Sequence, residues 1–481
     1  MKKILFFLLV FCCFSGVNAQ KSDSKDYSEA IKLIEVWLEA QKDYERIPAI
    51  MAIAVEDQEV IWEGAFGMAN LEKEVNAEPT TLCSICSISK LFTSVAIMKL
   101  YDEGKLRLDD EISDLLPWFD LKQQFPDSGP ITIRSLLTHS SGLPREANFP
   151  YWTGPDFPFP ESEAIKEELK KQETLYQSST YFQYSNLGLT LLGDVVEEVS
   201  GMPYDDYVEQ NILKPLGLSN TFTELTEDLY GGKLAVGYSP LSRDLQREKI
   251  NFFQAKGVKA AAGFSSNVQD LGKFASWQLR LRDTTTTEIL KPSTLRNMHN
   301  VHWIDPDWET SWGLGFSVYK GSDGTKWISH GGSCPGYRTT LQINPESKRA
   351  YSVMINANGT NPGKYAQGIH AILEKLGMAK DTSVTSNRQK INLQQYVGYY
   401  DTTPWSSEVY ISAWKDQLVM MSLPTSSPVD AMTFYKHIEG NTFRRIRDNE
   451  ELGETLEFET GEDGNVVRFK SHGNYSRKIT R

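Results

Sequence analysis

The 481-residue chain has no excess of basic residues, no run of basic side chains and no glycine-rich loop of the kind that holds phosphates. Its 63 acidic side chains outnumber its 50 lysines and arginines, which gives a formal net charge of −13 at pH 7. Such a surface repels polyanions. The sequence therefore predicts that neither nucleic acid nor a nucleotide is a partner.

A long apolar run at the start of the chain is also missing. The run at residues 4–14 is far shorter than the roughly 20 residues that a membrane-spanning helix needs. Lys2 and Lys3 precede it and small residues follow it at 15–19, an order typical of a secretory signal peptide. We expect residues 1–19 to be removed after Ala19, leaving a periplasmic or secreted protein with no integral membrane span.

Cysteine is scarce, and two of the five, Cys12 and Cys13, lie in the predicted leader. The other three are Cys83, Cys86 and Cys334, an odd number that leaves at least one thiol unpaired. Neither a second cysteine pair nor clustered histidines accompany the Cys83-x-x-Cys86 spacing, so we expect no metal site and interpret all three as small buried thiols. A Cys86–Cys334 disulfide is the alternative, because these two residues flank two motifs described below.

The stretch Ser87-Ile88-Ser89-Lys90 begins an apolar helical run that stops near Gly104. Residues three apart on a helix share a face, so Ser87 and Lys90 would point into one cleft. Free N–H groups and the positive end of the helix dipole would lie near Ser87. A hydroxyl beside an amine that can take its proton indicates acyl transfer with Ser87 as nucleophile, although a solvated helix edge is the simpler interpretation of this short pattern alone.

A second motif, Tyr184-Ser185-Asn186, begins another helical run. Lys90 can act as a base only when it is neutral, and burial or a second cation, such as a protonated His330, would lower its pKa. Tyr184 would pass a proton between serine, lysine and leaving group, and Asn186 would orient Lys90 and the substrate. The alternative is that Ser185 or Asn186 simply caps the helix, and both roles can hold together.

A third motif, His330-Gly331-Gly332-Ser333, lies at the end of a predicted strand. Its glycines would let the backbone lie against a substrate without side-chain obstruction. The N–H of Ser333 and that of Ser87 would form an oxyanion hole, in which each donor contributes about 3 kcal/mol. An ordinary turn at the strand end is the alternative.

These three motifs, in this order, resemble those of the serine β-lactamase and penicillin-binding-protein superfamily. His330 stands where many β-lactamases have the lysine of Lys-Thr-Gly, and the His-x-Gly version is similar to that of DD-carboxypeptidases, D-aminopeptidases and some esterases of the class C-like branch. His139 lies in a segment that resembles a packing segment of the family, so we expect it to be structural. The resemblance covers about residues 27–378 and includes the segments 131–144, 201–204, 215–218 and 262–271.

Apolar periodicity predicts an α+β domain over residues 20–380, with an antiparallel sheet of about five strands drawn from both ends of the domain and a helical lobe inserted between them. A polar linker at 381–390 would lead to an all-β, barrel-like module at 391–481. Helices at 28–44 and 364–376 would face the sheet. The strands are expected at 49–55, 59–66, 314–320, 326–329, 337–343 and 350–355.

We therefore expect an exported serine hydrolase that cleaves amide or ester bonds through an acyl-enzyme and needs no cofactor. The resemblance favours a small peptide substrate and a DD-carboxypeptidase or D-aminopeptidase-like activity. A carboxylesterase, a weak class C-like β-lactamase and a catalytically silent binding protein are the alternatives. An α/β-hydrolase is disfavoured, because Gly331-Gly332-Ser333-Cys334-Pro335 departs from the Gly-x-Ser-x-Gly elbow at its last position.

Overall fold

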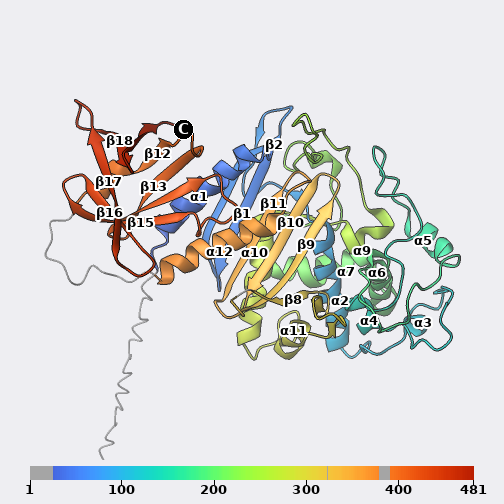
Figure 1. The fold of residues 1–481 in the computed structure, drawn as a ribbon. Helices are drawn as coiled ribbons and strands as arrows, with labels where there is room; N and C mark the ends of the chain where they lie inside the picture. The colour runs from blue at the N-terminus through green and yellow to red at the C-terminus, as the bar shows by residue number, and fades with distance from the viewer. Residues whose placement is uncertain (1–24, 322, 379–390) are drawn as a thin grey trace, which may run out of the picture.

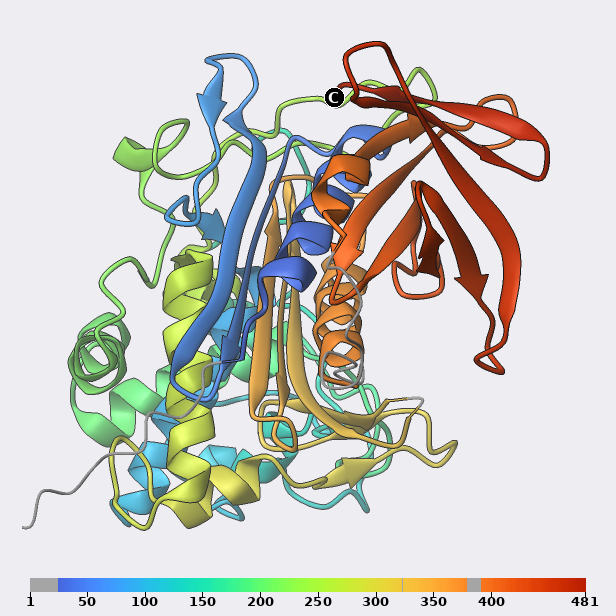
Figure 2. The same cartoon turned by 90° about the vertical axis from the view of Figure 1, so that its left-hand side faces the viewer.

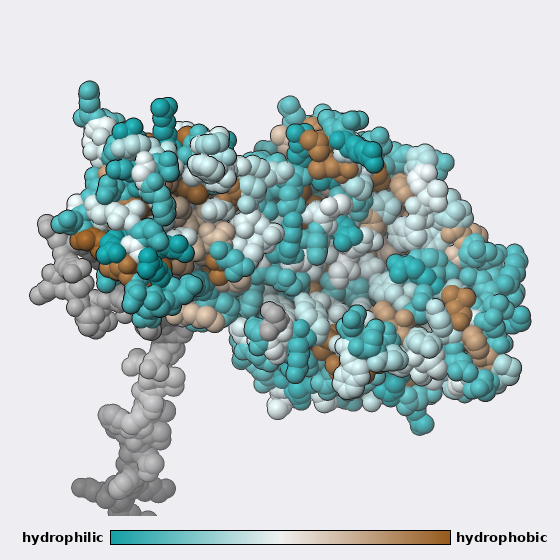
Figure 3. Space-filling model, viewed as in Figure 1, coloured by the Kyte–Doolittle hydropathy of each residue, from teal (hydrophilic) through white to brown (hydrophobic). Residues whose placement is uncertain are grey.

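The computed structural model describes residues 25–321, 323–378 and 391–481, so the expected leader (1–19) and linker (381–390) lie outside the described residues. Figure 1 shows a larger unit built on a sheet and a smaller C-terminal barrel beside it. Within the described ranges, no helix combines the length and apolar character needed to cross a membrane. The face of the molecule in Figure 3 is mostly hydrophilic, with small separate apolar patches.

The larger unit contains a nine-stranded antiparallel sheet with the order β3-β2-β1-β11-β10-β9-β8-β7-β6. Strands β1 and β2 come from the start of the domain, and β1 pairs with β11 from its end, as the sequence predicts. Short strands at the two edges extend the predicted core of about five. The bounds are β1 Ala49–Glu56, β2 Glu59–Asn70, β3 Val75–Asn76, β6 Trp303–Ile304, β7 Ser311–Trp312, β8 Ser317–Lys320, β9 Lys326–Cys334, β10 Tyr337–Asn344 and β11 Arg349–Ile355.

Helices cover both faces of this sheet (Figure 2). The predicted first and last helices, α1 (Ser28–Tyr44) and α12 (Pro362–Met378), pack on one face, and α10 (Val268–Asp283) packs on the other. Successive side chains of β1 alternate between the two faces of the sheet. Because helices cover both faces, β1 is buried on both sides. Ile50 belongs to the apolar cluster of α1 and α12, whereas Ile53 belongs to the cluster that contains α10.

The expected helical lobe lies between the two halves of the sheet in sequence. At its centre α2 packs against α6 and α9. The bounds are α2 Ser89–Asp102, α3 Ile112–Leu115, α4 Ile133–Leu137, α5 Ser162–Leu169, α6 Asn186–Ser200, α7 Tyr204–Val208, α8 Lys214–Leu216, α9 Lys259–Ala262 and α11 Pro292–Met298, with the short elements β4 Cys83–Ser84, β5 Ser265–Ser266 and the 3-10 turn η1 Cys86–Ile88.

The C-terminal unit is a closed eight-stranded barrel, in agreement with the barrel-like module expected from the sequence. Its interior is filled by apolar and aromatic side chains, among them Tyr396, Phe443 and Leu456. The bounds are β12 Gly398–Asp401, β13 Glu408–Trp414, β14 Gln417–Leu423, β15 Met432–Glu439, β16 Thr442–Ile446, β17 Leu452–Thr460, β18 Val466–Ser471 and β19 Asn474–Ile479.

Helix α1 lies between the sheet and the barrel (Figures 1 and 2). Its Trp37 is fully buried and donates a hydrogen bond from Nε1 to the Thr425 carbonyl (2.9 Å). Trp37 shares one apolar cluster with Tyr410, Trp414 and Met421 of the barrel. The two units are therefore joined by a continuous core.

Candidate active site

Ser87 lies in the 3-10 turn η1, directly before α2, at the helix start that the sequence predicts. Ser89 Oγ donates a 2.5 Å hydrogen bond to the carbonyl of Cys86, a residue held at a left-handed φ of 51°. Ser87 is partly exposed although its neighbours on both sides are buried. The turn therefore presents this hydroxyl, and not the adjacent side chains, to solvent.

Lys90 is completely buried one helical turn after Ser87. Its Nζ lies 3.2 Å from Ser87 Oγ and 2.7 Å from both Asn186 Oδ1 and the Ala261 carbonyl oxygen. Burial holds the pKa of Lys90 well below the usual lysine range, and although the negative charge of Glu146 opposes this, the cation of Arg145 reinforces it. The buried amine beside a hydroxyl is the arrangement that the Ser-x-x-Lys spacing predicts.

Tyr184 joins the same group of side chains. Its ring centroid lies 4.9 Å from Lys90 Nζ. Burial of the hydroxyl raises the pKa of Tyr184, an effect that the nearby Ser87 side chain and the Arg145 cation offset only in part. The His139 ring packs against the tyrosine ring at 4.3 Å between centroids. The phenol is therefore held in its protonated form next to the serine.

Asn186 and Ser185 divide the two roles that the sequence leaves open. Ser185 is the N-cap of α6, accepting a 2.9 Å hydrogen bond from the N–H of Gly188. Asn186 is the first residue of the helix, and its buried side chain accepts from Lys90 and donates from Nδ2 to Glu146 Oε1 at 2.7 Å. Capping and a place in the site are therefore both present.

The third motif lies within β9, which continues to Cys334 and not only to residue 329 as expected. A Cβ added to Gly332 would lie 2.1 Å from Thr339 Oγ1 and 2.3 Å from the Ile85 carbonyl oxygen, so only glycine lets β9 pack against η1. A Cβ on Gly331 would meet nothing nearer than 3.8 Å. Gly332 thus serves close packing, and exposed Gly331 leaves the strand surface open.

The backbone N–H of Ser333 is free to point away from β10. Cys334 and Tyr337 pair across a two-residue hairpin turn, which makes the next pair, Ser333 and Arg338, a non-hydrogen-bonded pair. Strand β8 pairs with β9 only from Lys326 to Ser329, so the edge beside Ser333 is not covered by a strand. This geometry suits the predicted oxyanion-hole donor. The Ser333 side chain itself accepts a 2.8 Å hydrogen bond from Arg338.

His330 is buried and neutral. Its Nδ1 lies 2.8 Å from the Gly331 carbonyl oxygen, and Nε2 has no hydrogen-bond partner among the residues that the structure describes. Burial, together with the nearby Lys90, lowers the pKa of His330 to about 3. The expectation that protonated His330 supplies a second cation near Lys90 is therefore wrong, and Arg145 takes that place.

Sequence reasoning missed Arg145 and Glu146, which follow the family-like segment 131–144. Arg145 lies over the Tyr184 ring, with 5.0 Å from its guanidinium carbon to the centroid, and forms a 3.3 Å ion pair with Glu146. The hydroxyl of Tyr151 also donates to Glu146. These are isolated charges in a loop, without the spacing or periodicity that would single them out.

His139 packs in the wall of the site, as expected for a structural histidine. It is 1% exposed, and its Nδ1 accepts a 3.2 Å hydrogen bond from the N–H of Ser185. Trp312 meets its ring edge-on at 5.2 Å. Burial, with Lys90 as the next contributor, keeps the pKa of His139 well below the usual histidine range. A neutral imidazole therefore supports the Tyr184 ring.

A disulfide joins Cys86 to Cys334, across a sequence separation of 248 residues. The interpretation of all three cysteines as thiols is thus wrong for this pair and right for buried Cys83. Each bridged cysteine is the direct neighbour of a proposed oxyanion-hole residue, Ser87 or Ser333. The bridge ties η1 to β9 at the point where the two elements meet.

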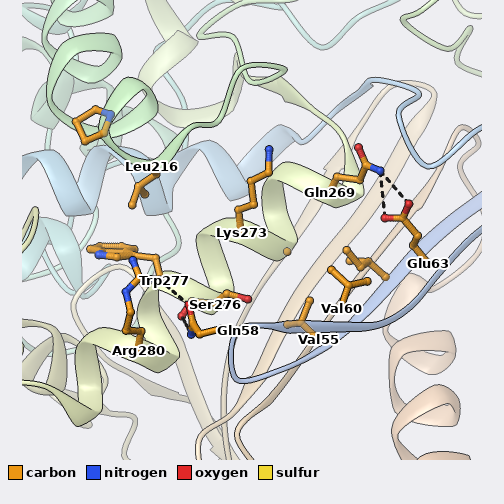
Figure 4. Close-up of a pocket in the computed structure, with 13 residues that line it drawn as sticks. Val55, Gln58, Val60, Glu63, Leu216, Gln269, Lys273, Ser276, Trp277 and Arg280 are labelled. Atoms are coloured by element: carbon orange, nitrogen blue, oxygen red, sulfur yellow. Dashed lines mark hydrogen bonds between the residues drawn. The ribbon is translucent and has the colours of Figure 1, made fainter. Parts of the chain in front are cut away.

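Two hollows lie outside this group of residues. One of about 460 Å³ lies between the β1–β2 hairpin and α10, where Gln269 donates two hydrogen bonds to Glu63 (Figure 4). The other, of about 530 Å³, is lined by side chains that include Tyr181, three residues before Tyr184. No predicted site residue lines either hollow.

A model of the beta-lactamase family matches residues 35–374. The chain belongs to the beta-lactamase family. Beta-lactamase-like protein 2 of Dictyostelium discoideum is 27% identical over 349 residues, which are 66% of this chain and 60% of that protein. The Escherichia coli (strain K12) protein named "Putative D-alanyl-D-alanine carboxypeptidase" is 28% identical over 56% of this chain and 71% of its own length. The chain therefore spans only about 60% of the Dictyostelium relative.

Solved structures of this family share the fold. The octameric penicillin-binding protein homologue from Pyrococcus abyssi is 25% identical, with a TM-score of 0.64, over 93% of this chain and 100% of its own. The class C beta lactamase from Rhodobacter sphaeroides is 19% identical, with a TM-score of 0.57, over 72% of this chain and 100% of its own. The beta-lactamase fold of the larger unit is thereby established.

Proposed function

We propose that this member of the beta-lactamase family is an exported serine hydrolase that cleaves the amide bonds of small peptides through a Ser87 acyl-enzyme, with a DD-carboxypeptidase or D-aminopeptidase-like specificity. The observation that carries the proposal is the 3.2 Å approach of Ser87 Oγ to the amine of a fully buried Lys90. A serine hydroxyl becomes a good nucleophile only when a neighbouring base removes its proton.

Lys90 is suited to be that base. A neutral amine has two N–H bonds and one lone pair, and the two 2.7 Å contacts to Asn186 and Ala261 take the N–H bonds. The lone pair is then left for the Ser87 hydroxyl. As Ser87 Oγ bonds to the substrate carbonyl carbon, its proton passes to Lys90 and the carbonyl oxygen becomes an oxyanion. The N–H groups of Ser87 and Ser333 would stabilise this oxyanion.

Tyr184 is suited to the opposite task. Because burial raises its pKa, the phenol keeps its proton and can donate it to the leaving amine as the carbon–nitrogen bond breaks. The tyrosinate then recovers a proton from protonated Lys90, whose Nζ lies 4.9 Å from the centroid of the tyrosine ring. Water then attacks the acyl-enzyme by the same steps in reverse, which frees Ser87 and releases the acid.

The neutral His330 bears on the substrate class. Many β-lactamases place a lysine cation in this position for the antibiotic carboxylate, whereas buried His330 has its pKa lowered to about 3 and offers no charge. This disfavours β-lactam antibiotics, and within the proposed peptidase activity it favours substrates without a carboxylate at this point, such as D-aminoacyl amides, over D-Ala-D-Ala peptides. A carboxylesterase is the second candidate, since an ester without a carboxylate needs no cation at the position of His330 for its binding. Efficient β-lactam hydrolysis and catalytic silence are the less favoured outcomes.

Intact-mass measurement tests the proposal. The chain is mixed with D-Ala-D-Ala peptides, D-aminoacyl amides, short esters and a cephalosporin, and the mass is searched for an added acyl group. We expect an adduct with at least one substrate, loss of the adduct and of turnover in Ser87→Ala, and no change in Ser162→Ala, which alters an exposed serine of α5. Equal turnover by Ser87→Ala overturns the mechanism. N-terminal sequencing of the exported protein tests cleavage after Ala19.

A further inference from the structure

Glu146 occupies an unusual place beside the proposed base. It does not touch Lys90 or Ser87 directly but holds the residue that does, because Asn186 Nδ2 donates to Glu146 Oε1 at 2.7 Å while Asn186 Oδ1 accepts from Lys90 at 2.7 Å. The other carboxylate oxygen accepts from Tyr151. Glu146, Asn186 and Lys90 thus form a chain of hydrogen bonds that ends at the nucleophile.

The chemistry of a carboxylate fixes the orientation of the amide. An asparagine side chain can rotate by half a turn and exchange its oxygen for its NH2 group at little cost. An ionised carboxylate only accepts, so it selects the NH2 end and leaves the amide oxygen facing Lys90. The Asn186 oxygen in turn holds one N–H of the amine, so that the lone pair is directed toward Ser87. Without Glu146 the reversed amide would present N–H bonds to the amine.

The charges around Lys90 also come from this loop. The groups that face it are Glu146 and Arg145 after α4, Tyr184 before α6, His139 in the wall and His330 on β9. Burial keeps both imidazoles uncharged and the phenol protonated near neutral pH. Among the residues that the structure describes, the charged neighbours of the amine are therefore one anion, Glu146, and one cation, Arg145, which form an ion pair with each other.

We propose that Glu146 is a positioning residue, which orients the Asn186 amide toward Lys90 and, balanced by Arg145, sets the charge that surrounds the amine. The proposal rests on the proposed function, because it takes Lys90 as the base of Ser87. It predicts that Glu146 and Arg145 act on the same proton in opposite directions: the anion favours the protonated amine, and the cation favours the neutral one.

A fluorophosphonate probe measures this directly, whatever the natural substrate is. Ser87 Oγ bonds to phosphorus, fluoride leaves, and the serine proton passes to Lys90, so the labelling rate follows the fraction of neutral amine. The rate is measured between about pH 5 and pH 9 for the wild type, Glu146→Gln, Glu146→Ala and Arg145→Met. Glu167→Gln, which removes the same charge from an exposed position on α5, is the matched control.

Each variant has its own expected result. Glu146→Gln keeps an acceptor for Asn186 but loses the charge, so the acidic limb of the rate profile moves to lower pH by about one unit, with the plateau within about threefold of the wild type. Arg145→Met moves the limb to higher pH by a similar amount. Glu146→Ala loses the orientation as well, and its plateau falls by about tenfold or more. Glu167→Gln leaves the limb in place.

A merely structural Glu146 would change the thermal stability and the plateau without moving the limb. Limbs that stay fixed, or that move in the same direction in Glu146→Gln and Arg145→Met, overturn the inference, as does wild-type labelling of Glu146→Ala. These results leave Ser87 labelled and the proposed function intact. A wild type that is not labelled at Ser87, or a Ser87→Ala variant labelled equally fast, overturns the proposed function and this inference with it.

Discussion

Gly331 and Gly332 are neighbours on β9, yet their surroundings differ completely. The Gly332 position faces the Ile85 carbonyl and the Thr339 hydroxyl at distances that no Cβ can adopt, whereas the Gly331 position is open. Gly332 therefore holds β9 against the turn that carries Ser87, and Gly331 leaves the space beside the strand open. Replacing each glycine in turn by alanine, which adds one methyl group, distinguishes close packing from open space.

Gly332→Ala should push β9 away from η1. Overpacking of this kind costs about 1–3 kcal/mol, so we expect the free energy of unfolding to fall by that amount in urea, with labelling of Ser87 by a fluorophosphonate strongly reduced. Gly331→Ala is the matched control for stability and should unfold within about 0.5 kcal/mol of the wild type. Equal stability of both variants would show that β9 does not depend on the close contact.

The residues of the site divide by the kind of signal they give. Ser87, Lys90, Tyr184 and Asn186 stand at helix starts with fixed spacing, and the structure brings them together as predicted. Glu146 lies in an irregular loop, and its contact with Asn186 joins residues 40 apart in sequence. A long-range contact of a lone charge leaves no local pattern, so no reasoning from the sequence alone could have found it.

Among the elements, η1 and β9 form the unit on which the proposed oxyanion hole depends. They come from opposite ends of the domain and are tied by the Cys86–Cys334 bridge, by the contact at Gly332 and by a 3.2 Å hydrogen bond from Thr339 Oγ1 to the Ile85 carbonyl. The bridge constrains a loop of more than two hundred residues in the unfolded chain, a situation in which a disulfide stabilises strongly.

Replacement of both bridged cysteines by serine should therefore lower the free energy of unfolding by about 2–4 kcal/mol. Cys83→Ser, which alters the buried free thiol and keeps the bridge, is the control and should lose stability on reduction as the wild type does. The wild type is expected to lose stability on reduction, and the double variant is not. Thiol titration of denatured residues 20–481 should find one free thiol before reduction and three after it; three before reduction would contradict the bridge.

Regular elements with clear periodicity were the ones that the sequence predicted well. Helix α1 has the expected bounds, and β1, β10 and β11 agree closely. Neither the two-residue edge strands nor the continuation of β9 through its glycines was predicted. In β9 the reason is that glycine carries no side chain whose alternation can be followed. Strand neighbours, which depend on the whole sheet, fix these elements instead.

At the scale of the whole molecule, buried titratable groups set the response to acid. His139, His299 and His330 are buried and have lowered pKa values, chiefly through loss of solvation. In the unfolded chain each takes up a proton near pH 6.5, so acid favours unfolding below that pH. Asp194 and Glu224, whose pKa burial raises to about 7, act in the opposite sense. The pH dependence of the free energy of unfolding of the wild type therefore contains both effects.

Comparing the stability of the wild type with that of a variant lacking one buried histidine isolates the contribution of that histidine. His299 lies outside the proposed site, and its ring nitrogens form hydrogen bonds with the side chains of Gln278 and Arg282. His299→Gln should be less stable than the wild type at pH 7.5 because these contacts change, and the gap should narrow as the pH falls below about 6.5, by up to about 1.4 kcal/mol per pH unit. Urea unfolding at pH 7.5 and pH 5.5 measures the gap. A gap that is constant, or that widens in acid, would contradict a neutral buried imidazole.

Helix α1 has a consequence for how the whole protein responds to a ligand. One side of the helix supports the sheet that carries β9, and the Trp37 indole reaches into the barrel at Thr425. Local unfolding of the barrel would expose this helix and α12 together. The local stability of the barrel is therefore coupled to that of the larger unit. Binding of a tight inhibitor at Ser87 would accordingly slow amide hydrogen exchange in the strands of the barrel.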